Sequence, residues 1–232
     1  MTTIDAHGNV LSPGAGDTRP YHERYVAAPH FRDREHEFSA VKFGVWLFLS
    51  TEVLLFSGMF VGYATLRYLH PEAFRGGAHH LDTHWGLINT IVLLISSYTI
   101  ASAVRAAQLG RNGALQTYLM ITNICALAFI LIKFVFEYSH KWHEGLLPGK
   151  YYSYPNPSNP SEPLWWGIYW GATGIHATHV AVGIVLITWL WFRARKQHFG
   201  PTHYNAVEGV ALYWHIVDIV WIFLFPLLYL IH

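Results

Sequence analysis

The stretch 213–230, YWHIVDIVWIFLFPLLYL, decides how the rest of the chain has to be interpreted. Its residues are almost all apolar or aromatic, and its length is close to what an α-helix needs to cross the core of a bilayer. His215 and Asp218 lie inside it, three residues apart. A carboxyl group and an imidazole are costly at that depth unless they face protein. The stretch therefore predicts one helix of a membrane-spanning bundle.

The composition agrees with this interpretation. Of the 232 residues, 53% are hydrophobic and only 12% are charged, and ten are Trp. These values favour a small membrane bundle over a soluble domain. The formal net charge of +1 argues against nucleic acid as a partner. The single cysteine, Cys125, excludes an intrachain disulfide and a metal cluster built on several thiolates.

Hydropathy divides the chain into two parts. Residues 1–37 form a polar segment without an apolar signal-peptide core, and we expect an extended or disordered cytoplasmic tail. Residues 38–232 contain five apolar segments, at about 38–69, 84–108, 114–138, 164–192 and 205–231. Each is long enough to span a membrane, so we predict an all-α integral membrane protein with five transmembrane helices. The YPNPSNPSEP run makes the 139–163 connection a loop.

Positively charged residues predict how the helices are oriented in the membrane. With a cytoplasmic N-terminus, ten Lys and Arg residues fall on the inner side and four on the outer side, Lys133 being left out because it lies within a helix. Because cytoplasmic loops carry the excess of Lys and Arg, we expect the N-terminus inside and the C-terminus outside.

Glu52 lies near the middle of the first apolar segment. It follows Lys42 by about 15 Å of helix, and its own helical face is apolar. Either another helix provides a partner for Glu52, or the carboxyl group is held protonated. A structural role and a proton-linked role both remain open, and we favour the structural one.

Two further segments carry polar groups that suit contacts between helices. Lys133 and Glu137 are four residues apart on one helical face, and we expect an ion pair close to the outer surface, which the lysine can reach. The segment 84–108 carries several side chains that can hydrogen-bond across helices, namely Asn89, Thr90, Ser96, Ser97 and Thr99.

The segment 164–192 has two distinct faces. One is a stripe of small residues on which another helix can pack, formed by Gly167, Gly171, Gly174, Thr178 and Ala181. The other carries His176 and His179, three residues apart. These are the best candidates for a metal or haem, but both lie on one turn and lack co-ligands at matching depth. We therefore expect no metal site and favour hydrogen bonds between helices.

In the last segment, Glu208, His215 and Asp218 fall within about 80° of one helical face. Three ionisable groups on one face of a spanning helix have to look into protein. We expect their partners to be Glu52 and the His176–His179 face.

Five segments, in order, resemble subunit III of haem-copper terminal oxidases. They are FLSTEVLLFSGMF, LINTIVLLISS, FVFEYSHKW, GATGIHATHVAVG and YWHIVDIVWIFLF. The similarity covers about residues 38–231 and is typical of the short five-helix bacterial form, which lacks the first two helices of the seven-helix form. Lys133 stands where many members of that family have Gln.

The resemblance implies an accessory subunit without a catalytic site or a cofactor of its own. Haems and copper are then expected in the partner subunits I and II of a proton-pumping complex in the bacterial plasma membrane. Glu52 matches the carbodiimide-reactive carboxylate of the family, and Arg193 matches an arginine that contacts phospholipid. The tail and the 139–163 loop are candidates for contacts with other respiratory subunits.

Three alternatives remain on the sequence alone. One is an accessory subunit of a nitric oxide reductase-type complex, and another is a haem-bearing electron carrier. The third is a free-standing ligand or ion carrier, although no helix is visibly broken by paired Gly and Pro.

Overall fold

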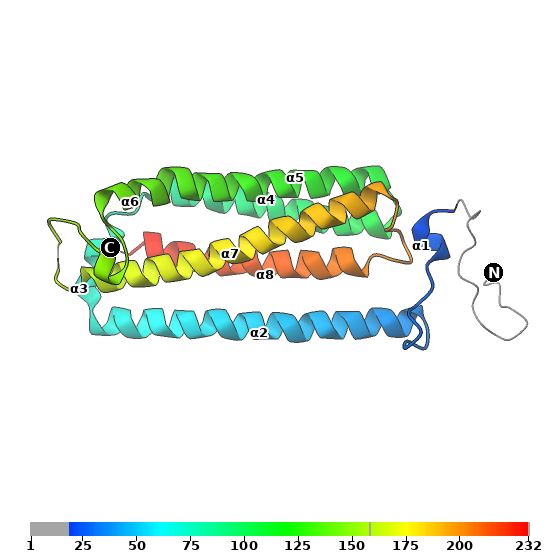
Figure 1. Cartoon of the computed structure of the whole chain (residues 1–232), viewed down its shortest axis with the longest axis horizontal. Helices are drawn as coiled ribbons and strands as arrows, with labels where there is room; N and C mark the ends of the chain where they lie inside the picture. The colour runs from blue at the N-terminus through cyan, green and yellow to red at the C-terminus, as the bar shows by residue number, and fades with distance from the viewer. Residues whose placement is uncertain (1–18, 158, 232) are drawn as a thin grey trace, which may run out of the picture.

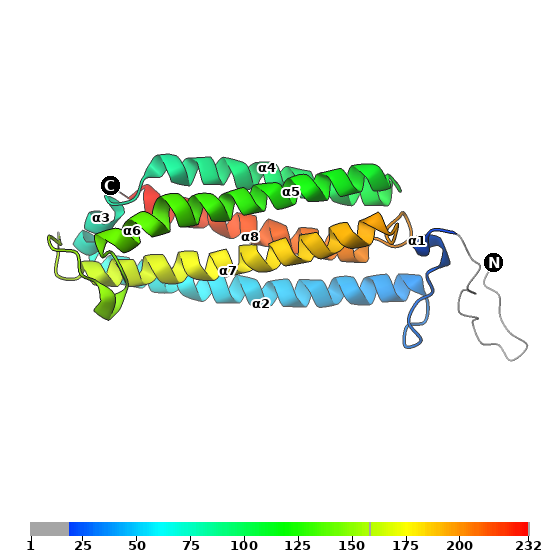
Figure 2. The same ribbon diagram turned by 45° about the horizontal axis from the view of Figure 1, so that its top comes forward.

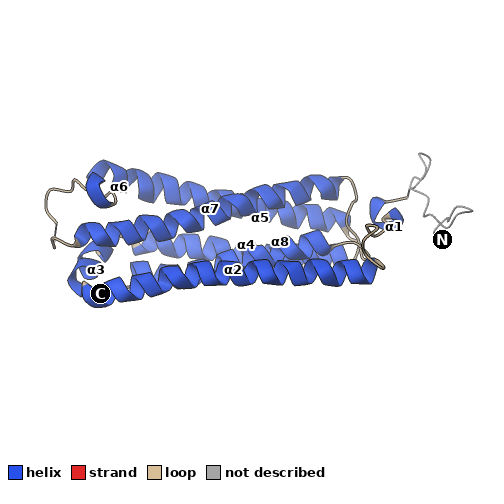
Figure 3. Cartoon of the chain, turned by 60° about the horizontal axis from the view of Figure 1, so that its bottom comes forward, coloured by secondary structure: helices blue, strands red, loops and turns tan. Residues whose placement is uncertain are grey.

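The computed structural model describes residues 19–157 and 159–231, and these form long helices that run side by side (Figures 1 and 3). The α-helices are α1 (Tyr21–Arg24), α2 (Arg34–Leu69), α3 (Pro71–Ala78), α4 (Thr83–Gln108), α5 (Asn112–Ile132), α6 (Ser139–Glu144), α7 (Glu162–Arg195) and α8 (Asn205–Tyr229). A π-helix, Lys133–Tyr138, joins α5 to α6, and a 3₁₀ turn spans Gly149–Tyr151.

The five predicted spanning helices are confirmed. Five helical segments are long and apolar enough to cross a membrane, and the π-helix makes α5 and α6 one continuous segment. The ends differ from the predicted ones: α2 begins at Arg34 because the Asp33 carboxylate accepts a hydrogen bond from the His36 amide at 2.7 Å. Asp82 caps α4 in the same way. The short helix α3 was not predicted.

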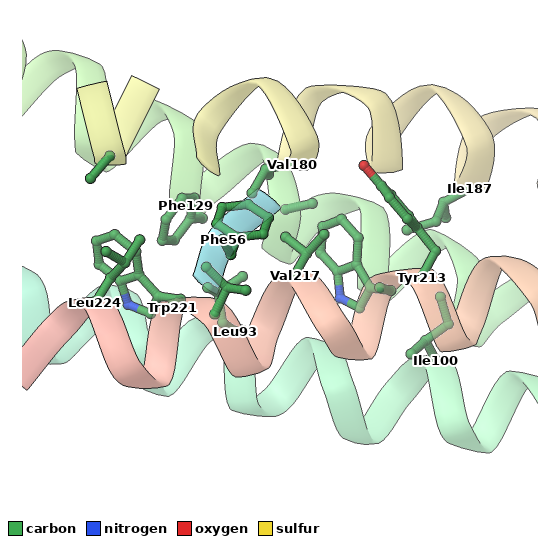
Figure 4. Packing of buried hydrophobic residues seen from close by; sticks show 14 of the residues in the cluster. Phe56, Leu93, Ile100, Phe129, Val180, Ile187, Tyr213, Val217, Trp221 and Leu224 are labelled. Atoms are coloured by element: carbon green, nitrogen blue, oxygen red, sulfur yellow. The ribbon is translucent and has the colours of Figure 1, made fainter. Parts of the chain in front are cut away.

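Four helices form the core of the bundle, and α2 is added at the side. The core is a ring in which α4 contacts α5, α5 contacts α7, α7 contacts α8, and α8 contacts α4. Helix α2 packs mainly on α8 and lies apart from α4 and α5 (Figures 1 and 2). Its buried side chains Leu49, Phe56 and Tyr63 recur every seven residues, and Phe56 points into the core (Figure 4). The other faces of α2 are exposed and apolar, as expected of a surface that faces lipid or another subunit.

The small-residue stripe of α7 faces away from this core. A Cβ atom added at Gly167, Gly171 or Gly174 would meet no atom within 4 Å, so none of the described helices packs there. The close approach of α7 occurs at Gly183 instead, where an added Cβ would lie 2.4 Å from the Trp214 ring of α8.

The described part of the N-terminal segment is docked rather than free; residues 1–18 lie outside the described residues. The Tyr21 ring stacks on His198 at 4.2 Å, and the Tyr25 ring lies 4.1 Å from that of His203, so the segment covers the α7–α8 loop. The Tyr25 hydroxyl donates to the Glu37 carboxylate at 2.5 Å. Burial and this hydrogen bond raise the pKa of Tyr25 to about 12, which keeps its hydroxyl protonated.

This docking is expected to weaken as the pH falls. Burial lowers the pKa of His203, an effect that Glu37 opposes and that the positive charges of Arg193 and Arg34, together with His198, reinforce. Docking is then complete above the ordinary histidine pKa of about 6.5 and decreases below it. The protection factors of amides 21–31, which correct for the slower intrinsic exchange at lower pH, are expected to fall between pH 7 and pH 5.5. A His203→Phe variant should show no such fall; an equal fall in that variant would contradict this role of His203.

Candidate functional site: a mid-membrane proton pair and a buried lysine cluster

Glu52 and His179 form a pair between α2 and α7. The Glu52 Oε2 atom lies 2.8 Å from His179 Nε2, and both side chains are largely buried, at 14% and 17% exposure. The second ring nitrogen, Nδ1, lies 2.8 Å from the carbonyl oxygen of Ile175. Tyr213 of α8 donates to the carbonyl oxygen of His179 at 2.9 Å, so this turn of α7 is fixed from two sides.

The hydrogen bonds determine how many protons the pair holds. A carbonyl oxygen only accepts, so Nδ1 of His179 has to carry a hydrogen. The contact with Glu52 then needs one more hydrogen, either on the carboxyl group or on Nε2. In both cases the pair is neutral overall and shares one proton, which lowers the cost of placing it inside a membrane. The structure therefore supplies the partner that the sequence analysis expected for Glu52 from another helix.

A double-mutant cycle is expected to detect this pair. Glu52→Ala leaves His179 Nε2 without its partner and should cost about 1–3 kcal/mol of unfolding free energy. Glu52→Gln should cost less unfolding free energy, because an amide can donate to Nε2. If the shared proton resides on Glu52, this variant should also remove the infrared band of the protonated carboxyl group. The measurement is the coupling between Glu52→Ala and His179→Ala in detergent unfolding; additive losses would refute the pair.

An apolar groove runs from this pair toward the N-terminal end of the bundle. It has a volume of about 460 Å³ and is lined by α2, α7 and α8, with walls that include Val45, Phe48, Val182 and Val210. Glu52 and His179 also line it. We name it the N-terminal groove.

Lys133 and Glu137 form an ion pair, as predicted, but away from the surface. The Lys133 ammonium group lies 2.6 Å from Glu137 Oε2, and each residue is only 1% exposed. The same oxygen accepts hydrogen bonds from the hydroxyl groups of Tyr169 at 2.9 Å and Tyr229 at 2.5 Å. Lys133 also donates to the Tyr229 hydroxyl. These four residues are the buried lysine cluster. The expectation that Lys133 reaches the outer surface is wrong, because α7 and α8 enclose it.

Aromatic rings surround the ammonium group as well. Lys133 Nζ lies 4.9 Å from the Trp221 ring centroid, 5.1 Å from Tyr229 and 5.3 Å from Tyr169. Cation–π attraction is strongest at desolvated sites such as this one. The π-helix places the cluster at a local widening of the α5–α6 segment, a feature often found at functional sites. Tyr169, Tyr229 and Trp221 could not be predicted as members of this site, because the aromatic residues of α7 and α8 are too numerous to single out by spacing.

The two histidines of α7 have different environments. His176 is 1% exposed, and its ring stacks on Trp221 at 5.2 Å and meets the edge of Phe129 at 5.6 Å. Neither of its nitrogens has a hydrogen-bond partner among the described residues. His176 is therefore a packing residue, and only His179 makes the predicted bond to another helix.

The polar face of α8, which carries Glu208, His215 and Asp218, contacts α2 and α4 and not the residues that the sequence predicted. Glu208 pairs with Lys42 of α2 at 2.9 Å, and His215 lies 2.8 Å from Ser97 of α4. The Asp218 carboxyl group, in a residue that is 3% exposed, has Ser97 as a polar neighbour, but neither of its oxygens has a hydrogen bond of normal geometry within the described chain. The predicted contact of these three residues with Glu52 and the two histidines is wrong, because α8 turns this face toward α2 and α4.

Four of the five polar side chains predicted on α4 do bond across helices. Thr90 accepts from the Trp221 indole, Ser96 accepts from the Trp214 indole, and Ser97 and Thr99 bond to His215 and Thr122. Asn89 is fully buried, and its amide group has no partner in the described part of the chain.

The deep histidines of α7 and α8 have different neighbours. His179 is held by Glu52 and Ile175, His215 faces Ser97, and one face of His176 is covered by Trp221. Among residues 19–157 and 159–231 there is no group of three or more His, Cys, Asp or Glu side chains that could hold a metal ion.

Comparison with known proteins identifies the family. Residues 32–232 match the family model described as "Cytochrome c oxidase subunit III". The chain is 31% identical over 200 residues to "Probable quinol oxidase subunit 3" of Staphylococcus epidermidis, which covers 85% of this chain and 92% of that protein. It is 30% identical over 208 residues to "Cytochrome c oxidase subunit 3" of Corynebacterium diphtheriae, covering 89% and 95%. The chain therefore belongs to the cytochrome c oxidase subunit III family.

Proposed function

We propose that this chain is the accessory, cofactor-free subunit III of a proton-pumping haem-copper oxidase that reduces oxygen to water. In this role it holds no redox centre, binds subunits I and II, and stabilises the catalytic subunit. Membership of the subunit III family is the observation that carries the proposal. The names of the relatives include both quinol and cytochrome c oxidases, so either electron donor fits.

The arrangement of polar and apolar side chains agrees with the role of an accessory subunit. Glu52, Lys133, Glu137 and Glu208 are each engaged by side chains of the same chain. The outward faces of α2 are apolar, with Leu54 71% exposed and Val61 65% exposed. The apolar outer faces of such a bundle can contact lipid and a partner subunit, whereas its charged side chains bind one another and hold the helices together.

We further propose that a structural phospholipid binds at the N-terminal end. The N-terminal groove suits an acyl chain, because its walls are mostly apolar. Arg193 lies at the end of α7, bonded to His198 at 3.0 Å, and its buried Nε has no partner within the described residues. No carboxylate of the described chain pairs with it, which suits contact with a phosphate.

We also propose that the chain lies in the membrane with its N-terminus on the cytoplasmic side. With five spans, the two ends of the described chain lie at opposite ends of the bundle (Figure 1). The excess of Lys and Arg at the N-terminal end supports a cytoplasmic N-terminus in a bacterial plasma membrane.

Turnover of the oxidase with and without this chain tests the proposed role. We expect the complex that lacks the chain to keep its haem spectrum, to begin oxygen reduction, and to lose activity faster during turnover. Adding the chain back should restore the stability. If the chain itself carries a haem band, or if its absence leaves both turnover and stability unchanged, the proposal is wrong.

A further inference from the structure

A second groove lies at the opposite end of the bundle. Helices α2 and α8 end there near α3 (Figure 2). Its volume is about 620 Å³. The walls are apolar and include Phe60, Ala64, Leu227 and Ile231, and the rim carries two arginines, Arg67 and Arg75. We name it the C-terminal groove. It shares no lining residue with the N-terminal groove.

The charge of Arg67 is not compensated within the described residues. Its Nη1 donates to the Tyr63 hydroxyl at 3.4 Å, and no carboxylate of residues 19–157 or 159–231 pairs with it. Tyr63 in turn donates to the carbonyl oxygen of Leu227, so its hydroxyl is held in place as an acceptor for Arg67. Arg75 differs, because it forms an exposed pair with Glu72 at 2.9 Å. Within the described part of the chain, Arg67 is thus a positioned guanidinium group that lacks an anion.

The position of Arg67 along α2 matches the depth of lipid phosphates. Lys42, near the other end of the same helix, lies about 37 Å away at 1.5 Å per residue. A bilayer has a hydrocarbon core of about 30 Å and is about 40–45 Å thick with its headgroups. Both cations therefore fit the headgroup layers, one in each leaflet. Lys42 has Glu208 as its partner, whereas Arg67 has a groove beside it.

We propose that the C-terminal groove binds one anionic glycerophospholipid of the leaflet opposite the N-terminus. Arg67 holds the phosphate by charge-assisted hydrogen bonds, Arg75 adds positive charge at the rim, and an acyl chain lies along Phe60, Ala64, Leu227 and Ile231. The apolar walls favour a lipid over free phosphate, which would leave them exposed. The inference depends on the membrane-spanning bundle and not on docking to a catalytic subunit.

Lipid retention by the purified complex tests this site. The chain, with the subunits that accompany it, is placed in phosphatidylcholine nanodiscs containing phosphatidylglycerol, and retained lipid is counted by mass spectrometry after detergent exchange. Arg67→Ala is expected to weaken phosphatidylglycerol retention about fivefold to tenfold, whereas Arg67→Lys should keep most of it. Ala64→Trp fills the groove while keeping the arginine, and it should cause a similar loss.

Arg105→Ala is the matched control. Arg105 is an exposed arginine at the other end of the bundle, bonded to Gln108 at 3.4 Å, and it lines neither described groove. Its loss should leave phosphatidylglycerol retention unchanged. Three results would overturn the site: full retention in Arg67→Ala, full retention in Ala64→Trp, or an equal loss in Arg105→Ala. A loss of phosphatidylcholine as large as that of phosphatidylglycerol would also exclude recognition of an anionic headgroup.

Discussion

Replacing Lys133 by Met is expected to destabilise the bundle by about 3–5 kcal/mol, the usual result of removing one partner of a buried ion pair. The variant keeps the volume of the side chain but removes the nearest cation of the Glu137 carboxylate in a site of 1% exposure. Two tyrosine hydroxyls remain, together with the Lys141 ammonium group 4.0 Å away, and they only partly offset the lost charge. Unfolding in mixed detergent micelles, followed by circular dichroism, measures the loss.

Two further variants separate the charge from the side-chain volume. The double variant Lys133→Met with Glu137→Gln removes both charges and is expected to recover part of the stability, since a neutral pair carries no uncompensated charge. Lys150→Met, at an exposed position of the Gly149–Tyr151 turn, should change stability by less than about 0.5 kcal/mol. A Lys133→Met variant as stable as Lys150→Met would contradict the buried lysine cluster.

Replacing Trp221 by Ala is expected to cost about 3–5 kcal/mol, as for other large buried aromatic residues. Trp221 is fully buried in the core (Figure 4) and contacts three of the four core helices that surround the cluster. It stacks on His176, meets Phe129 at 4.9 Å, and donates its indole hydrogen to Thr90 at 3.1 Å. Its removal opens a cavity beside the Lys133 ammonium group, so the loss combines packing and electrostatics.

Two control variants for Trp221→Ala are compared by the same unfolding measurement. Trp221→Phe keeps a ring but lacks the indole hydrogen, and it should cost about 1 kcal/mol from the lost bond to Thr90, plus a smaller packing loss. Trp142→Ala removes a tryptophan that is 64% exposed and should have little effect. If Trp221→Ala costs no more than Trp142→Ala, Trp221 does not link the helices as the structure indicates.

The spanning helices could be predicted from sequence because membrane helices need long apolar runs, and the run around Glu52 or His215 is unmistakable. Four of the five polar side chains predicted on α4 also form the expected bonds between helices, which follow from local chemistry. Helix α3 was missed because it has only eight residues and two of them are glycines.

The partners of the polar groups could not be predicted so well. A helical wheel shows that Glu208, His215 and Asp218 share a face, but not which neighbour that face meets. The ring order of α4, α5, α7 and α8 decides this, and it turns the face toward Ser97 and Lys42. The depth of Lys133 was misjudged for the same reason, because enclosure by α7 and α8 depends on tertiary packing. The stripe of small residues on α7 suggested a close neighbour, yet none of the described helices occupies it.

Purification of the tagged chain from its native membrane under mild detergent tests its assignment to an oxidase complex. We expect the chain to bring down a larger membrane subunit with a haem-copper spectrum, and the chain alone, after dissociation, to have no haem band and no bound metal. Isolation of the chain without a haem-containing partner, or with a haem of its own, would contradict the assignment as an accessory oxidase subunit.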